Sequence, residues 1–201
     1  MEQINNTVTL SGFIESDMVF SHEIFGEKFY TTSLAVGRLS DTYDHIPLMI
    51  SDRLSIPVKG EFYQIKGEFR SYNKHEGDKA RLILFVFVRD IDISEENVYT
   101  NRIYLNGYIC KKPEYRGTPL GREISDILMA VNSPYGKSYY LPCICWGRNA
   151  AYAEDELSIG DKIEINGRIQ SREYQKKTED GTLIDRIAYE VSISQIRKEG
   201  E

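Results

Sequence analysis

The second half of the chain shows the alternation of apolar and polar positions that is typical of β-strands. Ile103, Leu105 and Ile109 recur at every second or fourth residue, and in a strand such a period places them on one face. Similar runs predict five strands in this half: residues 103–109, 125–132, 139–146, 162–171 and 186–193. A segment rich in Ala and Glu, 148–157, lies between the third and fourth strands. With Gly160 just beyond it, this segment predicts a short helix ended by a glycine.

An internal repeat extends this pattern to the first half. NTVTLSGFI at residues 6–14 matches NRIYLNGYI at residues 101–109, an offset of 95. After a five-residue insertion the offset becomes 100, and Gly60 and Gly67 then align with Gly160 and Gly167. One register held over most of a repeating unit indicates two copies of a single fold.

The order of the predicted elements identifies that fold. Five strands with a helix between the third and fourth are the arrangement of an oligonucleotide/oligosaccharide-binding (OB) barrel. We therefore predict an all-β chain of two tandem five-stranded OB-fold barrels, in domains 1–97 and 98–201 joined by a short polar linker. In the first copy, residues 51–60 replace the helix region and contain Pro57, so little or no helix is expected there.

The charge of the chain is divided unevenly between the two copies. The whole chain has a net charge of -6, which by itself weighs against binding to a polyanion. Residues 1–97 contain 10 Lys and Arg against 16 Asp and Glu, whereas residues 98–201 contain 15 of each kind. The acidity therefore belongs to the first domain, and the second is neutral.

Several classes of protein are excluded or disfavoured. No apolar run approaches the ~20 residues of a membrane span, and the N-terminus lacks the basic and apolar regions of a secretory signal. Three cysteines do not make a disulfide framework, so we expect a cytoplasmic protein with no membrane partner. Cys143 and Cys145 are expected to be buried, and no His accompanies them in this half as a zinc site would need. We find no catalytic constellation and predict a protein that is not an enzyme, with no metal or cofactor.

Aromatic residues of the second copy are the candidate chemistry. OB barrels bind single strands by stacking bases on aromatic side chains along a cationic groove. Strand parity places Tyr140 and Trp146 on one face with Pro142 and Ile144, while Leu141, Cys143 and Cys145 face the barrel interior. Such aromatics could instead fill a core or a subunit interface. Several of them on one face, with cations nearby, favour binding.

The second copy resembles the bacterial single-stranded DNA-binding protein family. The match runs through residues 101–121, 129–136, 141–150 and 159–174. It includes the segment PEYRGTPLG at 113–121 and the segment GRIQSREY at 167–174. The resemblance implies four base-stacking places, which in this chain are held by Tyr135, Tyr140, Trp146 and Tyr174.

The resemblance also implies a function and an assembly. We expect binding to single-stranded DNA without strong sequence preference, in replication, recombination or repair. The expected phosphate contacts are Arg102, Lys111, Arg116, Lys137, Arg148, Arg172, Lys176 and Lys177. Members of the family usually present four barrels, so two barrels per chain imply a homodimer. Replication or repair proteins are the expected partners, with the acidic first domain as a candidate surface for them.

The first copy departs from the pattern at every stacking place. By the repeat register, the four aromatics correspond to Ser40, His45, Ser51 and Lys74. The Phe residues of this copy then have two interpretations: core and subunit contacts, or a relocated binding surface formed by Phe20, Phe25 or Phe29 with Tyr30. Tyr43 and Tyr72 could restore some stacking. The alternative function is a protein-interaction adaptor, such as a primosome or mobile-element accessory factor, with little nucleic-acid binding.

Overall fold

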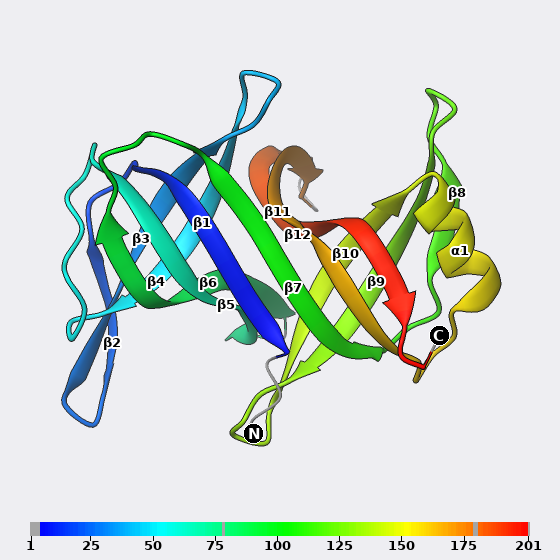
Figure 1. The fold of residues 1–201 in the computed structure, drawn as a ribbon, viewed down its shortest axis with the longest axis horizontal. Helices are drawn as coiled ribbons and strands as arrows, with labels where there is room; N and C mark the ends of the chain where they lie inside the picture. The colour runs from blue at the N-terminus through cyan, green and yellow to red at the C-terminus, as the bar shows by residue number, and fades with distance from the viewer. Residues whose placement is uncertain (1–4, 78, 179–180, 201) are drawn as a thin grey trace.

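The computed structural model describes residues 5–77, 79–178 and 181–200, which are mostly strand (Figure 1). The first half contains β1 (Asn6–Ile14), β2 (Val19–Ile24), β3 (Glu27–Gly37), β4 (Tyr43–Ser51), β5 (Phe62–Glu76) and β6 (Lys79–Ile93). The second half contains β7 (Thr100–Ile109), β8 (Glu114–Gly117), β9 (Glu123–Asn132), β10 (Ser138–Trp146), α1 (Arg148–Glu156), β11 (Lys162–Lys177) and β12 (Leu183–Lys198). The all-β prediction is confirmed.

Five strands in each half pair into a closed ring. The first ring runs β1–β3–β4–β6–β5 and returns to β1, and the second runs β7–β9–β10–β12–β11 and returns to β7. The pairings β4–β6 and β10–β12 are parallel, so in the second ring the chain must cross over between them, and α1 lies in that connection. We call these rings the first barrel and the second barrel. Their strand order and the place of α1 confirm the predicted OB fold.

The two barrels share an edge, which the sequence did not indicate. Residues 6–11 of β1 pair antiparallel with residues 100–105 of β7. Only the last residues of each strand close its own barrel, through β1 with β3 and β7 with β9. The described strands therefore form one continuous twelve-stranded sheet, and most of the buried apolar side chains of both barrels belong to a single hydrophobic cluster. The prediction of two tandem five-stranded barrels did not include this pairing, which is possible because the first strand of each repeat has backbone hydrogen-bonding groups left over beyond its own barrel.

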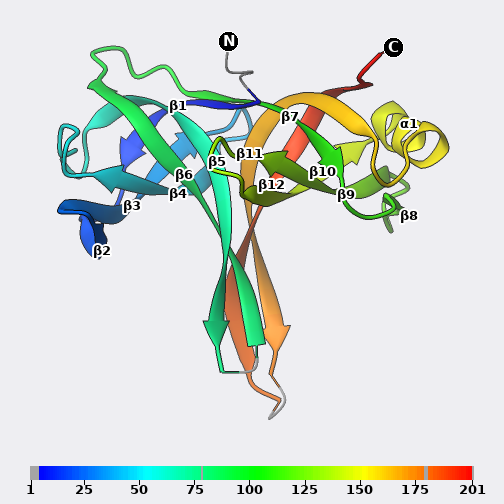
Figure 2. The ribbon, with the colours of Figure 1, turned by 90° about the horizontal axis from the view of Figure 1, so that it is seen from below.

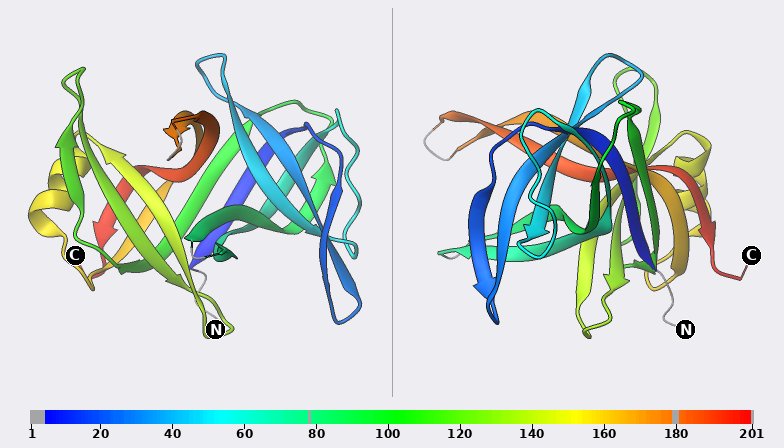
Figure 3. Two further views of the ribbon diagram at one scale, coloured as in Figure 1. Left: turned by 180° about the vertical axis from the view of Figure 1, so that it is seen from behind. Right: turned by 60° about the vertical axis from the view of Figure 1, so that its left-hand side comes forward.

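The fourth and fifth strands of each copy extend well beyond the barrel. β11 continues six residues past the predicted end at 171, and β12 starts at 183 and ends at 198. The extensions form two long hairpins, which we call the first arm (residues 71–76 and 79–84) and the second arm (residues 171–177 and 183–189). Both arms project from the same side of the molecule (Figure 2), and from behind they lie in the middle, between the barrels (Figure 3). The short strands β2 and β8 were not predicted either.

Equivalent contacts in the two halves confirm the repeat. Asn6 exchanges hydrogen bonds with the backbone of Phe69, at 2.7 and 2.9 Å, and Asn101 does the same with Ile169 at the same distances. The pairing of β5 with β6 shifts register at Gly67, and the pairing of β11 with β12 does so at Gly167. A Cβ at either glycine would lie 2.3 Å from a carbonyl oxygen of the partner strand, so both positions require glycine.

The helix region also follows the prediction, except at its end. α1 covers residues 148–156, whereas residues 52–61 of the first barrel contain no helix. The helix ends where Leu157 turns extended, three residues before Gly160. Gly160, with φ near +90°, instead forms the turn that leads into β11.

Candidate nucleic-acid interface

The outer face of β10 presents Tyr140 and Trp146 to solvent. Their exposed fractions are 45% and 39%, whereas Leu141 and Cys145 on the opposite face are fully buried. This is the division that strand parity predicts. Ile144 lies on the outer face but is buried, so the exposed surface of this strand consists mainly of its two aromatic ends.

Strand pairing adds an aromatic residue that sequence reasoning missed. Tyr140 lies opposite Ala130 of β9, and Ala130 lies opposite Tyr108 of β7. Residues directly opposite each other in antiparallel strands face the same side, so the two tyrosines flank a small alanine on one surface. Tyr108 is 41% exposed. The sequence signal for its exposure was its position in β7, where it alternates with the apolar residues Leu105 and Ile109.

A second row across the sheet joins Trp146 to a cation. Trp146 lies opposite Ile124, and Ile124 lies opposite Arg116 of β8. Arg116 is exposed, and its Nε donates to Asp126 Oδ2 at 2.9 Å. β8 therefore brings one predicted phosphate contact onto the face of Trp146, with its charge partly offset by a carboxylate.

Tyr135 lies on the turn between β9 and β10, next to the first barrel. It is 74% exposed and lines a groove of about 780 Å³ with Tyr139 and with residues of β1, β5 and β6. Arg89 of the first barrel also lines this groove. Burial lowers the pKa of Arg89, but its hydrogen bonds with Glu68 and with Tyr135 raise it above the ordinary value. The structure thus places Tyr135 in the groove between the barrels.

The second arm carries the fourth predicted aromatic. Arg172, Tyr174 and Lys176 alternate along β11 and so share a face, on which Tyr174 lies opposite Arg186 of β12. The guanidinium of Arg172 lies 5.9 Å from the centre of the Tyr174 ring. Lys177 points to the other face of the arm.

The remaining predicted cations are exposed but dispersed. They are Arg102 on β7, Lys111 in the β7–β8 connection, Lys137 beside Tyr135 and Arg148 at the start of α1. Arg102 lies opposite Thr9 in the β1–β7 pairing, and these strands lie on the side opposite the arms (Figure 2). The structure therefore does not bring Arg102 together with Tyr174.

Comparison with known proteins assigns this half of the chain. Residues 100–198 match the model of the single-strand binding protein family. These residues belong to that family. A single-stranded DNA-binding protein of Clostridium tetani is 35% identical over 88 residues, covering 41% of this chain and 59% of that protein. Single-stranded DNA-binding protein 1 of Staphylococcus aureus is 32% identical over 83 residues, covering 38% and 50%. The chain thus spans little more than half the length of these relatives.

Solved structures extend the likeness in fold to both barrels. The wild-type single-stranded DNA binding protein from Thermus aquaticus has a TM-score of 0.77 and 18% sequence identity, covering 98% of this chain and 93% of that one. A deletion mutant of the same protein gives a TM-score of 0.75. The first barrel therefore shares the fold of this arrangement although its sequence lies outside the family match.

The first barrel holds polar pairs where the family half holds exposed aromatics. His45, at the place of Tyr140, contacts Glu15 with 2.8 Å between Nδ1 and Oε2. Ser51, at the place of Trp146, donates from Oγ to Glu27. Neither place holds a tyrosine or tryptophan, as the departures in the sequence predict, so the first barrel lacks the exposed aromatic pair of β10.

The Phe residues of the first barrel divide between core and surface. Phe29 is buried and stacks on His22, with 4.9 Å between ring centres. Phe20 meets the Tyr30 ring edge-on at 5.8 Å. Phe25 is fully exposed at the β2–β3 turn, where its φ is +50°. An exposed aromatic group therefore exists on the β2–β3 hairpin, away from the places used in the family half.

Over the described residues, no group of His, Cys, Asp and Glu is arranged to hold a metal ion. The helix in the described chain is too short to cross a membrane.

Proposed function

We propose that the chain binds single-stranded DNA without strong sequence preference, in replication, recombination or repair. The observation that carries this proposal is the set of half-exposed aromatics on one outer surface of a barrel from the single-strand binding protein family: Tyr108, Tyr140 and Trp146. Every base has a π-face, so stacking on such a surface does not discriminate strongly between sequences.

The path of the strand follows from the positions of the other aromatics. From Trp146 and Arg116 the single-stranded DNA runs along β10 past Tyr140 and Tyr108. Tyr135 receives it at the groove between the barrels, and Tyr174 on the second arm offers a further stacking site. The phosphate contacts are Arg116, Arg172 and Lys176, with Lys137 near Tyr135 and Lys111, Arg148 and Lys177 toward the edges. Arg102 is the least favourable member of this group, because it lies opposite Thr9 in the β1–β7 pairing and not on the part of β7 that pairs with β9.

Titration with oligo-dT tests the function directly. Trp146 is the only tryptophan, so a base that stacks on it quenches the intrinsic fluorescence of the protein. Binding weakens with salt, since log K falls with log salt by about 0.7 for each phosphate neutralised on a single strand. Absence of both quenching and salt-sensitive binding would reject DNA binding in favour of a protein-interaction adaptor.

The assembly and the cell biology are part of the same proposal. Domains 1–97 and 98–201 act as a divergent barrel and a binding barrel, and two chains form a homodimer with four barrels. The protein works in the cytoplasm, with replication or repair proteins as partners. Size-exclusion chromatography with light scattering tests the dimer, which predicts about twice the chain mass of 23.2 kDa. A particle of one chain mass would refute it.

A further inference from the structure

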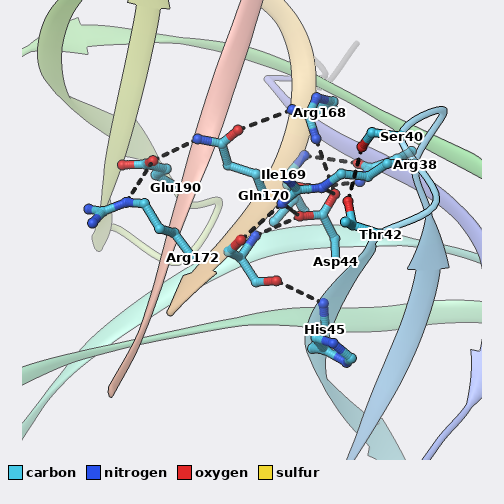
Figure 4. A network of polar contacts seen from close by, with 12 residues as sticks. Arg38, Ser40, Thr42, Asp44, His45, Arg168, Ile169, Gln170, Arg172 and Glu190 are labelled. Atoms are coloured by element: carbon cyan, nitrogen blue, oxygen red, sulfur yellow. Dashed lines mark hydrogen bonds and ion pairs between the residues drawn. The ribbon is translucent and has the colours of Figure 1, made fainter. Parts of the chain in front are cut away.

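The second arm leaves the barrel at Ser171, and there the first barrel holds it. The N–H of Ser171 donates to Asp44 Oδ1 at 2.8 Å, and its carbonyl oxygen accepts from Arg38 Nη2 at 2.9 Å. Its Oγ accepts from the N–H of His45, also at 2.9 Å. The backbone N–H, the backbone carbonyl and the hydroxyl of one residue are therefore all bonded to β4 and the turn before it (Figure 4).

Asp44 is the anchor of this contact. Its side chain is 1% exposed, and it is bonded by two guanidinium groups. Arg38 reaches it from the same barrel with Nε at 2.9 Å and with Nη2. Arg168 of β11, in the second barrel, donates to it from Nη1 at 3.1 Å. A buried carboxylate must keep such partners, so Asp44 fixes the position of β11 relative to the first barrel.

A relay of polar contacts continues from this anchor into the arm. Arg168 Nη2 donates to Gln170 Oε1 at 3.2 Å, and Gln170 Nε2 donates to Glu190 Oε1 at 2.7 Å. Glu190 lies 3.9 Å from Arg172 Nε, and Arg172 in turn lies over Tyr174. Residues 168, 170, 172 and 174 are on one face of β11. The relay therefore ends at the aromatic residue that the arm offers to a base.

The contacts of Asp44 with Arg38, Arg168 and Ser171, which we call the clamp, are not repeated at the equivalent described residues of the other arm. The N–H of Tyr140 donates to Ser71 Oγ at 2.9 Å, which is the equivalent of the bond between His45 and Ser171. On that other side, the places of Asp44, Arg38 and Arg168 are held by Tyr139, Ser133 and Glu68. A shared feature of the fold would be present on both sides. The contacts of Asp44 with Arg38 and Arg168 instead serve the arm that carries Tyr174, whereas near the start of the first arm Arg70 lies 5.5 Å from the centre of the Tyr139 ring.

We propose that the first barrel, through Asp44, is a positioning element that sets the second arm so that Tyr174 and Arg172 meet single-stranded DNA. This role rests on the proposed function. It gives the acidic barrel, which lacks the four aromatics, a part in binding without contact to the bases. Asp44 and Arg38 are positioning residues, since they act on the bound DNA only through Ser171 and Arg168 of β11.

A double-mutant cycle tests the proposal on the full chain. Tyr174→Ala in the wild type is expected to weaken binding of labelled oligo-dT by about 5- to 150-fold. In the Asp44→Asn background the same change should cost at least about threefold less, because the ring is no longer held in place. Trp146→Ala is the matched control: its factor should be the same in both backgrounds, since Trp146 lies at the far end of β10. A purely structural loss would change both factors alike.

Each outcome of the cycle decides something. An equal factor for Tyr174→Ala in both backgrounds overturns the positioning role while leaving DNA binding intact. If neither Tyr174→Ala nor Trp146→Ala weakens binding in the wild type, the stacking function fails and the positioning role fails with it. Should Asp44→Asn not fold by circular dichroism, Ser171→Ala takes its place in the cycle, because it removes only the hydroxyl acceptor and leaves the buried charges paired.

Discussion

Truncating the two aromatic ends of β10 is the sharpest test of how a single strand would lie on this surface. Tyr140→Ala and Trp146→Ala each remove a half-exposed ring and leave the backbone of the strand unchanged. Tyr140 keeps its N–H bond to Ser71 in the variant, because that bond is made by the main chain. Neither ring belongs to the hydrophobic core, so the variants should fold.

The magnitude follows from the distance between the rings. Six residues along a strand span about 20 Å, too far for one base to touch both. Each ring therefore serves its own base, and each loss is about 1–3 kcal/mol. Sites separated by more than about 10 Å are usually additive, so the double variant should lose about 2–6 kcal/mol of binding free energy.

Fluorescence anisotropy of labelled oligo-dT measures all the variants at one salt concentration, since the tryptophan signal is lost in both variants that contain Trp146→Ala. Tyr115→Ala is the matched control. Tyr115 is exposed to 40%, nearly the same as Trp146, but it neighbours Arg116 on β8 and so points to the opposite face. Its loss should leave the affinity within about twofold, below the roughly 1 kcal/mol of one stacked base. A double variant no weaker than either single variant, or an equal loss in Tyr115→Ala, would refute the two-site reasoning.

Three further predictions concern the fold. A Cβ at Gly107 would lie 2.5 Å from the carbonyl oxygen of Ala130, whereas none at Gly117 meets an atom within 4 Å. Gly107→Ala should therefore cost about 1–3 kcal/mol and lower Tm by about 2–12 °C, with Gly117→Ala close to the wild type in the same thermal scans. Cys143 and Cys145 are buried, which raises the pKa of Cys143 and raises that of Cys145 to about 11. Burial raises the pKa of Cys110 as well, but this thiol is only half-buried and Lys111 opposes the rise. A thiol reagent at pH 8 should therefore label Cys110 in the native protein and all three cysteines in denaturant; fast native labelling of all three would contradict the packing. The hydrogen bond with Tyr43 raises the pKa of Tyr99 to about 12, so the folded state holds this proton more tightly than the unfolded state. Stability should fall as pH rises from about 10 to 12, and less so in Tyr99→Phe.

The barrel strands and the exposed positions of Tyr140 and Trp146 could be read from the sequence because both follow from local alternation. In a half-buried strand the period of two sorts side chains into the core or solvent, so the parity of Tyr140 and Leu141 already separates them. The repeat register similarly identified the polar residues that replace the aromatics in the first barrel. The second arm was not predicted because residues 172–177 are exposed on both faces. A strand with solvent on both faces has no alternation of apolar and polar residues.

Contacts between distant parts of the chain were decided only by the tertiary structure. The pairing of β1 with β7 needs no special residues, since any strand offers the same backbone groups, and local sequence does not name the partner. Tyr108 shares a surface with Tyr140 only because Ala130 of β9 is paired with both residues. Asp44 and Ser171 are 127 residues apart in the chain, and nothing near either residue indicates the other. The sequence by itself determined which faces of the barrel strands are apolar and that Tyr140 and Trp146 lie on the outer face. The pairing of strands into two closed barrels that share one sheet determined which residues lie next to one another.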